Sequence, residues 1–150
     1  MPKAVLRRLL HPSDFSPASR AAFAKALELA HDSGAQLTVL HVRPVTLPVM
    51  GEGYISPQTY QALDRSAEAS AKKELDRLVQ QAKKRGVRAN GLLAVGVAHE
   101  QIVRAARRAR ADMIVMGTHG RTGVSRLFLG SVAGRVVSLA SCPVLTVRGR

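Results

Sequence analysis

Apolar positions follow two different periods along the chain, one typical of strands and one typical of helices. Residues 4–11 form a short run of mixed apolar character that stops at Pro12, a residue disfavoured inside a central strand. Ser16 and Pro17 are residue types that favour a helix start, and Gly34 is a type that favours a helix end. Between them apolar residues recur at spacings of three and four. The pattern therefore predicts a strand followed by a helix.

The rest of the chain continues this alternation. The same criteria predict strands at 35–42, 87–96, 111–117 and 143–148, and helices at 58–86, 98–110 and 131–140. Residues 43–57 hold three prolines and two glycines without a period, so we expect a long connection there. Strands that alternate with helices predict a single α/β domain over residues 1–150, with an open parallel sheet that is covered on both faces.

A ligand site is expected at one edge of this sheet. In open parallel sheets, ligands bind beyond the carboxyl ends of the strands, where the strand order reverses. Fold habit favours the order 3-2-1-4-5, which makes the first and fourth strands neighbours. Asp14, which follows the first strand, and Gly117, which ends the fourth, would then line the same crevice.

Composition narrows the range of functions. The chain has 150 residues, 3% of them aromatic, and a formal net charge of +13. The charge favours contact with polyanions, but so few aromatic residues provide no platform for stacked bases. No apolar run approaches the roughly 20 residues that span a membrane, and the N-terminus lacks a long apolar signal segment. The lone cysteine, Cys142, cannot form an internal disulfide, so we expect a soluble, cytoplasmic protein without a membrane partner.

The segment MGTHGRTGVSRLFLGSVAG near the C-terminus carries the candidate chemistry. Gly117, Gly120 and Gly123 are spaced by threes, and Gly130 and Ser131 begin the next predicted helix. Glycines let backbone N–H groups approach a ligand, and a helix N-terminus attracts phosphate. Spacing alone leaves a flexible surface loop open as the alternative. The chain has neither the P-loop pattern with its lysine nor a G-x-G-x-x-G after the first strand, which excludes those two kinds of nucleotide site.

The chain resembles the universal stress protein family over essentially its whole length. The resemblance is carried by HPSDFSPAS after the first predicted strand, by LTVLHV in the second, and by the stretch from GVAHEQIV to the last strand. Nucleotide-binding members of that family carry G-x2-G-x9-G-[ST], which Gly117, Gly120, Gly130 and Ser131 match. The resemblance implies a Rossmann-like, adenine nucleotide alpha hydrolase-like fold that binds ATP together with Mg²⁺, often as a homodimer.

The resemblance also implies which residues contact the nucleotide. The candidate set is Pro12, Ser13, Asp14, Val42, Met116, Gly117, Thr118, His119, Gly120, Arg121, Thr122, Gly123, Gly130, Ser131 and Val132. Asp14 would accept hydrogen bonds from the ribose or the adenine, or help to place Mg²⁺; the alternative is that it caps the helix that begins near Ser16. We expect no other side chain to hold a metal. Family dimers pair their last strands, which here run from Pro143 to Val147.

Four functions are consistent with these features. An ATP-binding stress-response or signalling module is favoured, with hydrolysis absent or slow, because the sequence offers no evident catalytic residue. In a slow ATPase switch, His119 or Asp14 would orient water. Four arginines of the predicted helix at 98–110 support weak binding of nucleic acid or another polyanion. A partner-docking dimer that needs no nucleotide is the fourth hypothesis.

Overall fold

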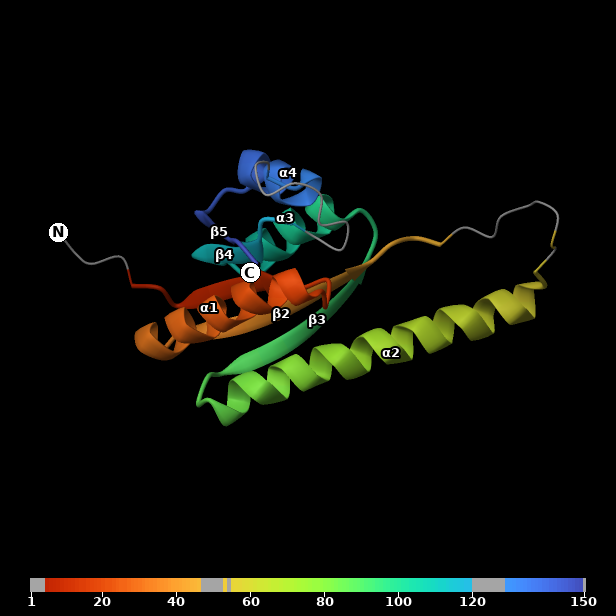
Figure 1. Cartoon of the computed structure of the whole chain (residues 1–150), viewed down its shortest axis with the longest axis horizontal. Coiled ribbons are helices and arrows are strands. Elements are labelled where there is room, and N and C mark those ends of the chain that lie inside the picture. Colours follow the sequence, from red (N-terminus) through yellow and green to blue (C-terminus); the bar gives the residue numbers. More distant parts are fainter. Residues whose placement is uncertain (1–4, 47–52, 54, 120–128, 150) are drawn as a thin grey trace.

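Strands and helices alternate along the whole chain. The structure, a computed structural model, describes residues 5–46, 53, 55–119 and 129–149. In chain order the elements are β1 (Arg8–Pro12), α1 (Pro17–Ser33), β2 (Gln36–Arg43), α2 (Pro57–Lys84), β3 (Ala89–Val95), α3 (Ala98–Arg108), β4 (Met113–Gly117), α4 (Ser131–Leu139) and β5 (Val144–Val147). All paired strands are parallel, and within the described residues they form one sheet in the order β3-β2-β1-β4-β5 (Figure 1). The predicted α/β fold and strand order 3-2-1-4-5 are both confirmed.

Local chemistry sets both ends of α1. Ser16 is the residue before the helix, and its Oγ accepts a hydrogen bond from the N–H of Ser19 at 3.2 Å. Pro17 occupies the first helical position, where its missing N–H removes no intrahelical bond. Gly34 ends the helix with φ at 69°, a left-handed conformation that a Cβ disfavours. These are the start and the end that the sequence predicts.

Helices cover both faces of the sheet, so its central strand is buried on each side. Leu9 of β1 packs with Phe23 of α1 and with residues of α2, whereas Leu10 packs with Ile102 of α3 and Val136 of α4. Figure 1 shows α3 and α4 together on one side and α2 along the other. Successive residues of a strand point to opposite faces, which is why a run of consecutive apolar residues fits this position.

The helix α2 is longer than the sheet that supports it. Its 28 residues span about 42 Å, whereas the seven residues of β3 span about 23 Å. Ala71 and Leu75 in the second half of α2 are buried, but Leu63 and Ala67 on the same predicted stripe are exposed. Figure 1 shows the beginning of α2 projecting past the sheet. The sequence therefore predicts the helix correctly, but it does not predict how much of the helix packs against the sheet.

Arg43 connects this projecting part to the sheet through two ion pairs. Arg43 ends β2, and its Nη2 donates to Oδ1 of Asp64 in α2 at 2.6 Å. The Arg43 side chain is 11% exposed and that of Asp64 is 45% exposed, so the pair is partly shielded from water. A carboxylate oxygen of Glu68 lies 4.0 Å from the same guanidinium. This contact holds α2 near the carboxyl end of β2.

Candidate ligand-binding site

The strands β1 and β4 part before β1 ends, and this opens a crevice. β1 pairs with β2 along all five of its residues but with β4 only at Leu9 and Leu10. Beyond Leu10 the backbone pairing of β1 with β4 stops. There the side chain of His11 joins the two strands, because its Nδ1–H donates to the carbonyl oxygen of Val115 at 2.8 Å. Burial lowers the pKa of His11 to about 4, so the ring is neutral at neutral pH with its proton on Nδ1. A neutral histidine thus bridges the strands where the crevice begins.

A cavity of about 520 Å³ occupies this crevice at the carboxyl ends of the strands. Its lining residues come from the ends of β1, β2 and β4 and from the starts of α1, α3 and α4. They are Pro12, Ser13, Asp14, Ser19, Leu40, Val42, Ala98, Ile102, Met116, Gly117, Thr118, His119, Leu129, Gly130, Ser131, Val132 and Ala133. The cavity lies where the strand order reverses, as the sequence predicts.

Hydrogen bonds hold the turn after β1 against the cavity. The Oγ atoms of Ser13 and Ser19 are 2.8 Å apart, and the Ser13 Oγ also accepts from the N–H of Phe15 at 3.1 Å. Asp14 lines the cavity while its Oδ1 accepts from the N–H of Ser16 at 2.9 Å. The helix cap is therefore Ser16 and not Asp14, and the carboxylate of Asp14 is fixed by the turn that precedes the cap.

An aromatic stack supports the same turn. Phe15 has φ at 62°, which is rare for a residue with a side chain and indicates a constrained backbone. Its ring stacks on His41 of β2 with ring centroids 4.1 Å apart, and His41 Nδ1–H donates to the carbonyl oxygen of Ser13 at 2.7 Å. His41 is thus a structural residue at the rim of the sheet, consistent with its position in a strand.

A short backbone contact joins the two ends of the glycine-rich segment. The N–H of Gly130, which precedes α4, donates to the carbonyl oxygen of Thr118 at 2.6 Å, and the N–H of Thr118 donates to Val147 of β5 at 3.0 Å. A Cβ on Gly130 would lie 2.8 Å from that same Thr118 oxygen, closer than van der Waals contact allows. Gly117 is less constrained, because a Cβ there would meet nothing nearer than 3.4 Å. Of these two glycines, Gly130 is therefore the one that the backbone requires.

The start of α4 presents backbone donors to the cavity. No side chain caps this helix, whose preceding residue is Gly130, and Ser131 and Val132 of its first turn line the cavity. The first amides of a helix have no intrahelical acceptor, and the helix dipole gives this end a partial positive charge. An anionic group in the cavity would meet both.

His119 contributes a polar atom whose partner is absent from the described parts of the chain. Its Nδ1 lies 2.9 Å from the Thr118 hydroxyl, but its Nε2 is buried without a hydrogen bond among the described residues. Buried polar atoms are normally paired, so an unpaired one at a cavity marks a position for a ligand atom or a water.

Every predicted site residue that the structure describes lines this one cavity: Pro12, Ser13, Asp14, Val42, Met116, Gly117, Thr118, His119, Gly130, Ser131 and Val132. Gly120, Arg121, Thr122 and Gly123 lie outside the described residues. The structure brings together three parts of the chain: residues 12–14, residue 42, and the segment that begins at residue 116. The second and third parts are more than 70 residues apart in the sequence.

Six further lining residues were not predicted: Ser19, Leu40, Ala98, Ile102, Leu129 and Ala133. Leu40 and Ile102 are buried, and their apolar character indicates core packing rather than a site. The start of α3 has no motif that would single out Ala98. The only usable signal was topological, since helix starts and strand ends meet at the same edge of a parallel sheet.

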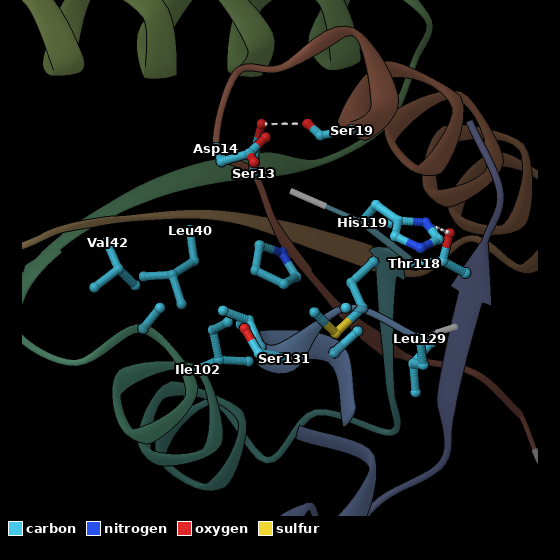
Figure 2. Close-up of a pocket in the computed structure, with 17 residues that line it drawn as sticks. Ser13, Asp14, Ser19, Leu40, Val42, Ile102, Thr118, His119, Leu129 and Ser131 are labelled. Atoms are coloured by element: carbon cyan, nitrogen blue, oxygen red, sulfur yellow. Dashed lines mark hydrogen bonds between the residues drawn. The ribbon is translucent and has the colours of Figure 1, made fainter. Parts of the chain in front are cut away.

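Apolar side chains gather on one side of the cavity, and polar side chains lie on both. Figure 2 shows Leu40, Val42 and Ile102 grouped together with Ser131 beside Ile102, and Thr118 and His119 across the cavity on the same side as Leu129. Asp14 lies at the margin between the two, on the turn after β1. A ligand with a flat apolar part and a polar, anionic part would match this division.

Metal-ligand clusters and candidate membrane spans are both absent from the described residues. Within the described residues there is no group of three or more His, Cys, Asp or Glu side chains that could hold a metal ion. No helix in the described parts of the chain combines the length and the apolar content that crossing a bilayer requires.

The fold and the cavity define an open α/β protein with a ligand site at the point where the strand order reverses. Residues 6–148 match the Universal stress protein family, and the chain belongs to that family. A universal stress protein of Thermus aquaticus is 40% identical over 129 residues, which cover 85% of this chain and 87% of the relative. One from Methanocaldococcus jannaschii is 32% identical over 142 residues, which cover 95% of this chain and 82% of the relative.

Solved structures share the fold. A universal stress protein from Lactobacillus plantarum superposes with a TM-score of 0.79 at 28% identity, covering 97% of this chain and 99% of its own. Two less similar proteins are complexes with nucleotides: one from Archaeoglobus fulgidus with dAMP (TM-score 0.66, 24% identity, coverage 96% and 99%) and one from Arabidopsis thaliana with AMP (0.68, 21%, 96% and 92%). A further universal stress protein is a complex with cAMP (0.70, 21%, 98% and 100%).

Proposed function

We propose that this protein binds an adenine nucleotide, ATP with Mg²⁺ by preference, as a stress-response or signalling module whose hydrolysis of ATP is absent or slow. The observation that carries the proposal is the cavity between β1 and β4, closed on one side by the contact from Gly130 to Thr118 and by the start of α4. Its volume of about 520 Å³ lies within the range of roughly 300–1,000 Å³ typical of small-molecule sites.

The division of the cavity supports a mononucleotide orientation. The adenine packs against the apolar side formed by Leu40, Val42 and Ile102, with the backbone of Val42 as a partner for its edge. The phosphates extend toward Ser131 and the free amides of the first turn of α4. The nucleotide complexes of the structural relatives, with AMP, dAMP and cAMP, support adenine as the base.

Asp14 and His119 complete the contacts. Asp14 keeps a fixed orientation through its bond to the N–H of Ser16, and its carboxylate accepts from the ribose or ligates Mg²⁺. The buried Nε2 of His119 hydrogen-bonds the ligand. Mg²⁺, when bound with the nucleotide, neutralises phosphate charge. Among the described lining residues Asp14 is the single carboxylate, and Arg121 of the candidate set lies outside the described residues.

Calorimetric titration with AMP, ADP and ATP, each with and without Mg²⁺, tests this function directly. We expect saturable heat with all three nucleotides, a matching rise in unfolding temperature, and little released phosphate over hours. No heat and no thermal shift with any of them would reject the proposal. Rapid release of phosphate would instead favour the ATPase switch, with His119 or Asp14 orienting water.

We further propose that two copies pair through the segment from Pro143 to Val147. β5 is at the margin of the sheet, hydrogen-bonded to β4 on one side. Its outer backbone groups are suited to pairing with another strand, and edge strands are common sites of such pairing. Native mass spectrometry measures both the subunit count and any nucleotide retained from the host; a monomer at micromolar concentration would contradict the dimer alone.

A further inference from the structure

The edge of the sheet opposite the cavity carries a dense group of basic side chains. Nine of the 23 basic residues lie at the starts of β1 and β3 or at the ends of α2 and α3. They form what we term the amino-edge basic surface: Arg7, Arg8, Lys83, Lys84, Arg85, Arg88, Arg107, Arg108 and Arg110, all exposed. Figure 1 shows the end of α2 turning into β3 at this edge. Parallel topology places these segments at the same end of the sheet, because every strand begins here, although α2 and α3 lie on opposite faces.

Two adjoining hollows make the centre of this surface concave. One of about 330 Å³ is lined by Arg7, Arg8 and Arg88, and the other, of about 480 Å³, is lined by Lys83 and again Arg88. Both are also lined by Gln36, so the two hollows adjoin each other. Among the described residues that line the two hollows there are four basic side chains and no acid. Such an arrangement concentrates positive potential in one place.

The acids nearby offset this charge only in part. Asp112 uses Oδ2 to accept from the backbone N–H groups of Arg7 and Arg8, both at 2.8 Å, and the charges of these two side chains also help to lower the pKa of its carboxyl. Asp32 at the end of α1 lies 3.3 Å from a ring nitrogen of His31. Arg88 gives one donor to the carbonyl oxygen of Gly34 at 3.1 Å, and a guanidinium has five.

Helix stabilisation explains only part of this charge. Basic residues in the last turn of a helix complement its dipole, which accounts for Lys83, Lys84 and their counterparts at the end of α3. Arg88 also meets a helix end, because it donates to the carbonyl oxygen of Gly34, which ends α1, whereas Arg7 and Arg8 flank or begin β1. Helix ends therefore leave the charges of Arg7 and Arg8, in the hollow that adjoins the one at Lys83, without an explanation.

We propose that the amino-edge basic surface binds the phosphate backbone of a nucleic-acid duplex without reading its base sequence. A duplex carries about one negative charge per 1.7 Å of its axis, a density that an array of basic side chains matches. Neither of the two hollows has an aromatic residue in its described lining, so single-stranded bases find no aromatic ring to stack on here. The proposal is independent of the nucleotide site, which lies at the other end of the strands, roughly 15–20 Å away.

The test compares two variants of equal charge in binding a fluorescent random-sequence DNA duplex over a salt series. The first carries Arg7→Gln, Arg8→Gln, Lys83→Gln and Arg88→Gln; the control carries Arg20→Gln, Arg65→Gln, Lys72→Gln and Lys73→Gln, all exposed. Each lowers the net charge of +13 by four. The plot of log affinity against log salt has a negative slope, and each lost phosphate contact reduces its magnitude by about 0.9. We therefore expect the magnitude to fall by about 3 to 4 in the first variant and to change little in the control.

Several outcomes would overturn the proposal. Equal losses in both variants would mean that net charge alone attracts the duplex. Displacement of the duplex by AMP would place it in the nucleotide cavity, and preferential binding of single strands or of anionic phospholipid vesicles would identify a different partner. If the fourfold variant does not unfold cooperatively, Lys83→Gln with Lys84→Gln replaces it, with an expected slope decrease of about 2. Arg7→Lys, Arg8→Lys and Arg88→Lys, which keep the charge, should preserve the slope.

Discussion

The two edges of the sheet both suit anions, but they do so by different means. At the carboxyl edge the described cavity offers backbone amides, hydroxyls and one carboxylate, with no basic side chain among its described lining. At the amino edge, four basic side chains line the two adjoining hollows. Amides held by a helix start act over a short range and select shape, whereas side-chain charges act over a long range and are screened by salt. The two proposed sites together would separate recognition of a particular anion from attraction of anions in general.

This difference has a direct experimental signature. Binding at the carboxyl edge should depend weakly on ionic strength, because neutral dipoles and apolar contacts contribute most of it. Binding at the amino edge should depend steeply on it. The following changes test this contrast between the carboxyl edge and the amino edge, beginning with the largest expected effect.

Acid should destabilise the protein through His11, at the point where the crevice opens. The pKa of His11 is lowered by burial to about 4 from 6.5. Above 6.5 the ring is neutral in both folded and unfolded chains, whereas between 6.5 and 4 the unfolded chain takes up a proton first. The free energy of unfolding therefore falls with pH by about 3 kcal/mol across this window. Urea unfolding from pH 7 to pH 4 measures it.

His11→Gln removes this titration and should flatten the pH dependence relative to the parent. His31→Gln, on the exposed end of α1, is the matched control for the replacement of a histidine. Parallel curves for the parent and His11→Gln would show that carboxylates and not His11 cause the acid loss.

Gly130→Val should selectively impair the carboxyl edge. A Cβ at this position would lie 2.8 Å from the carbonyl oxygen of Thr118, so the contact between the ends of the glycine-rich segment must open. We expect nucleotide affinity to fall at least about tenfold, equivalent to about 1.4 kcal/mol, by calorimetry. Duplex binding should be unaffected.

Gly134→Ala provides the control within the same helix. Its Cβ would meet nothing nearer than 4.0 Å, and alanine favours a helix interior over glycine by up to about 1 kcal/mol. It should raise the unfolding temperature slightly and preserve nucleotide affinity. Equal nucleotide affinity for Gly130→Val and Gly134→Ala would show that the Gly130 contact does not contribute to nucleotide binding.

Asp14→Asn separates the two roles of this side chain. The amide oxygen can still accept from the N–H of Ser16, so the turn should persist, but the charge that would ligate Mg²⁺ is lost. We expect the gain in ATP affinity on adding Mg²⁺ to shrink by a factor of about five, or about 1 kcal/mol. An unchanged gain would leave Asp14 with a role in the turn only.

Asp112→Asn should have the smallest effect, at the amino edge. The backbone N–H groups of Arg7 and Arg8 hold the pKa of the Asp112 carboxyl below its ordinary value. Its stabilisation is therefore present above that ordinary value and is lost as pH falls through the lowered one. Because the group is exposed, we expect under about 1 kcal/mol at pH 7, measured by urea unfolding. Duplex binding should tighten slightly, and weaker binding would argue against an electrostatic surface.

The sequence predicted best where neighbouring residues decide the outcome. The start and end of α1 follow from Ser16, Pro17 and Gly34, whose effects act within one turn. The strand order was expected from fold habit and not from any particular residue, and the meeting of Asp14 with Gly117 follows once that order is given. The predicted site residues within the described ranges share one cavity for the same reason.

What the sequence could not predict depends on distances across the fold. Leu40 and Ile102 have the character of core residues, and only the parting of β1 from β4 exposes them to a cavity. The bridge from His11 to Val115 joins residues 104 positions apart and has no motif. The stripe on α2 has the right period throughout, but period does not reveal where the supporting sheet ends.

The overhang of α2 gives one continuous helix two different local stabilities. In its second half, Ala71, Leu75 and Leu78 anchor successive turns to the sheet. The first half has the Arg43–Asp64 pair, a hydrogen bond from the Tyr60 hydroxyl to the carbonyl oxygen of Thr46, and its own helical hydrogen bonds. An unsupported helical stretch of about 14 residues is marginal in water. Amide protons of residues 57–70 should therefore exchange with deuterium by fraying from the N-terminal end, while those of residues 71–84 wait for opening of the whole domain.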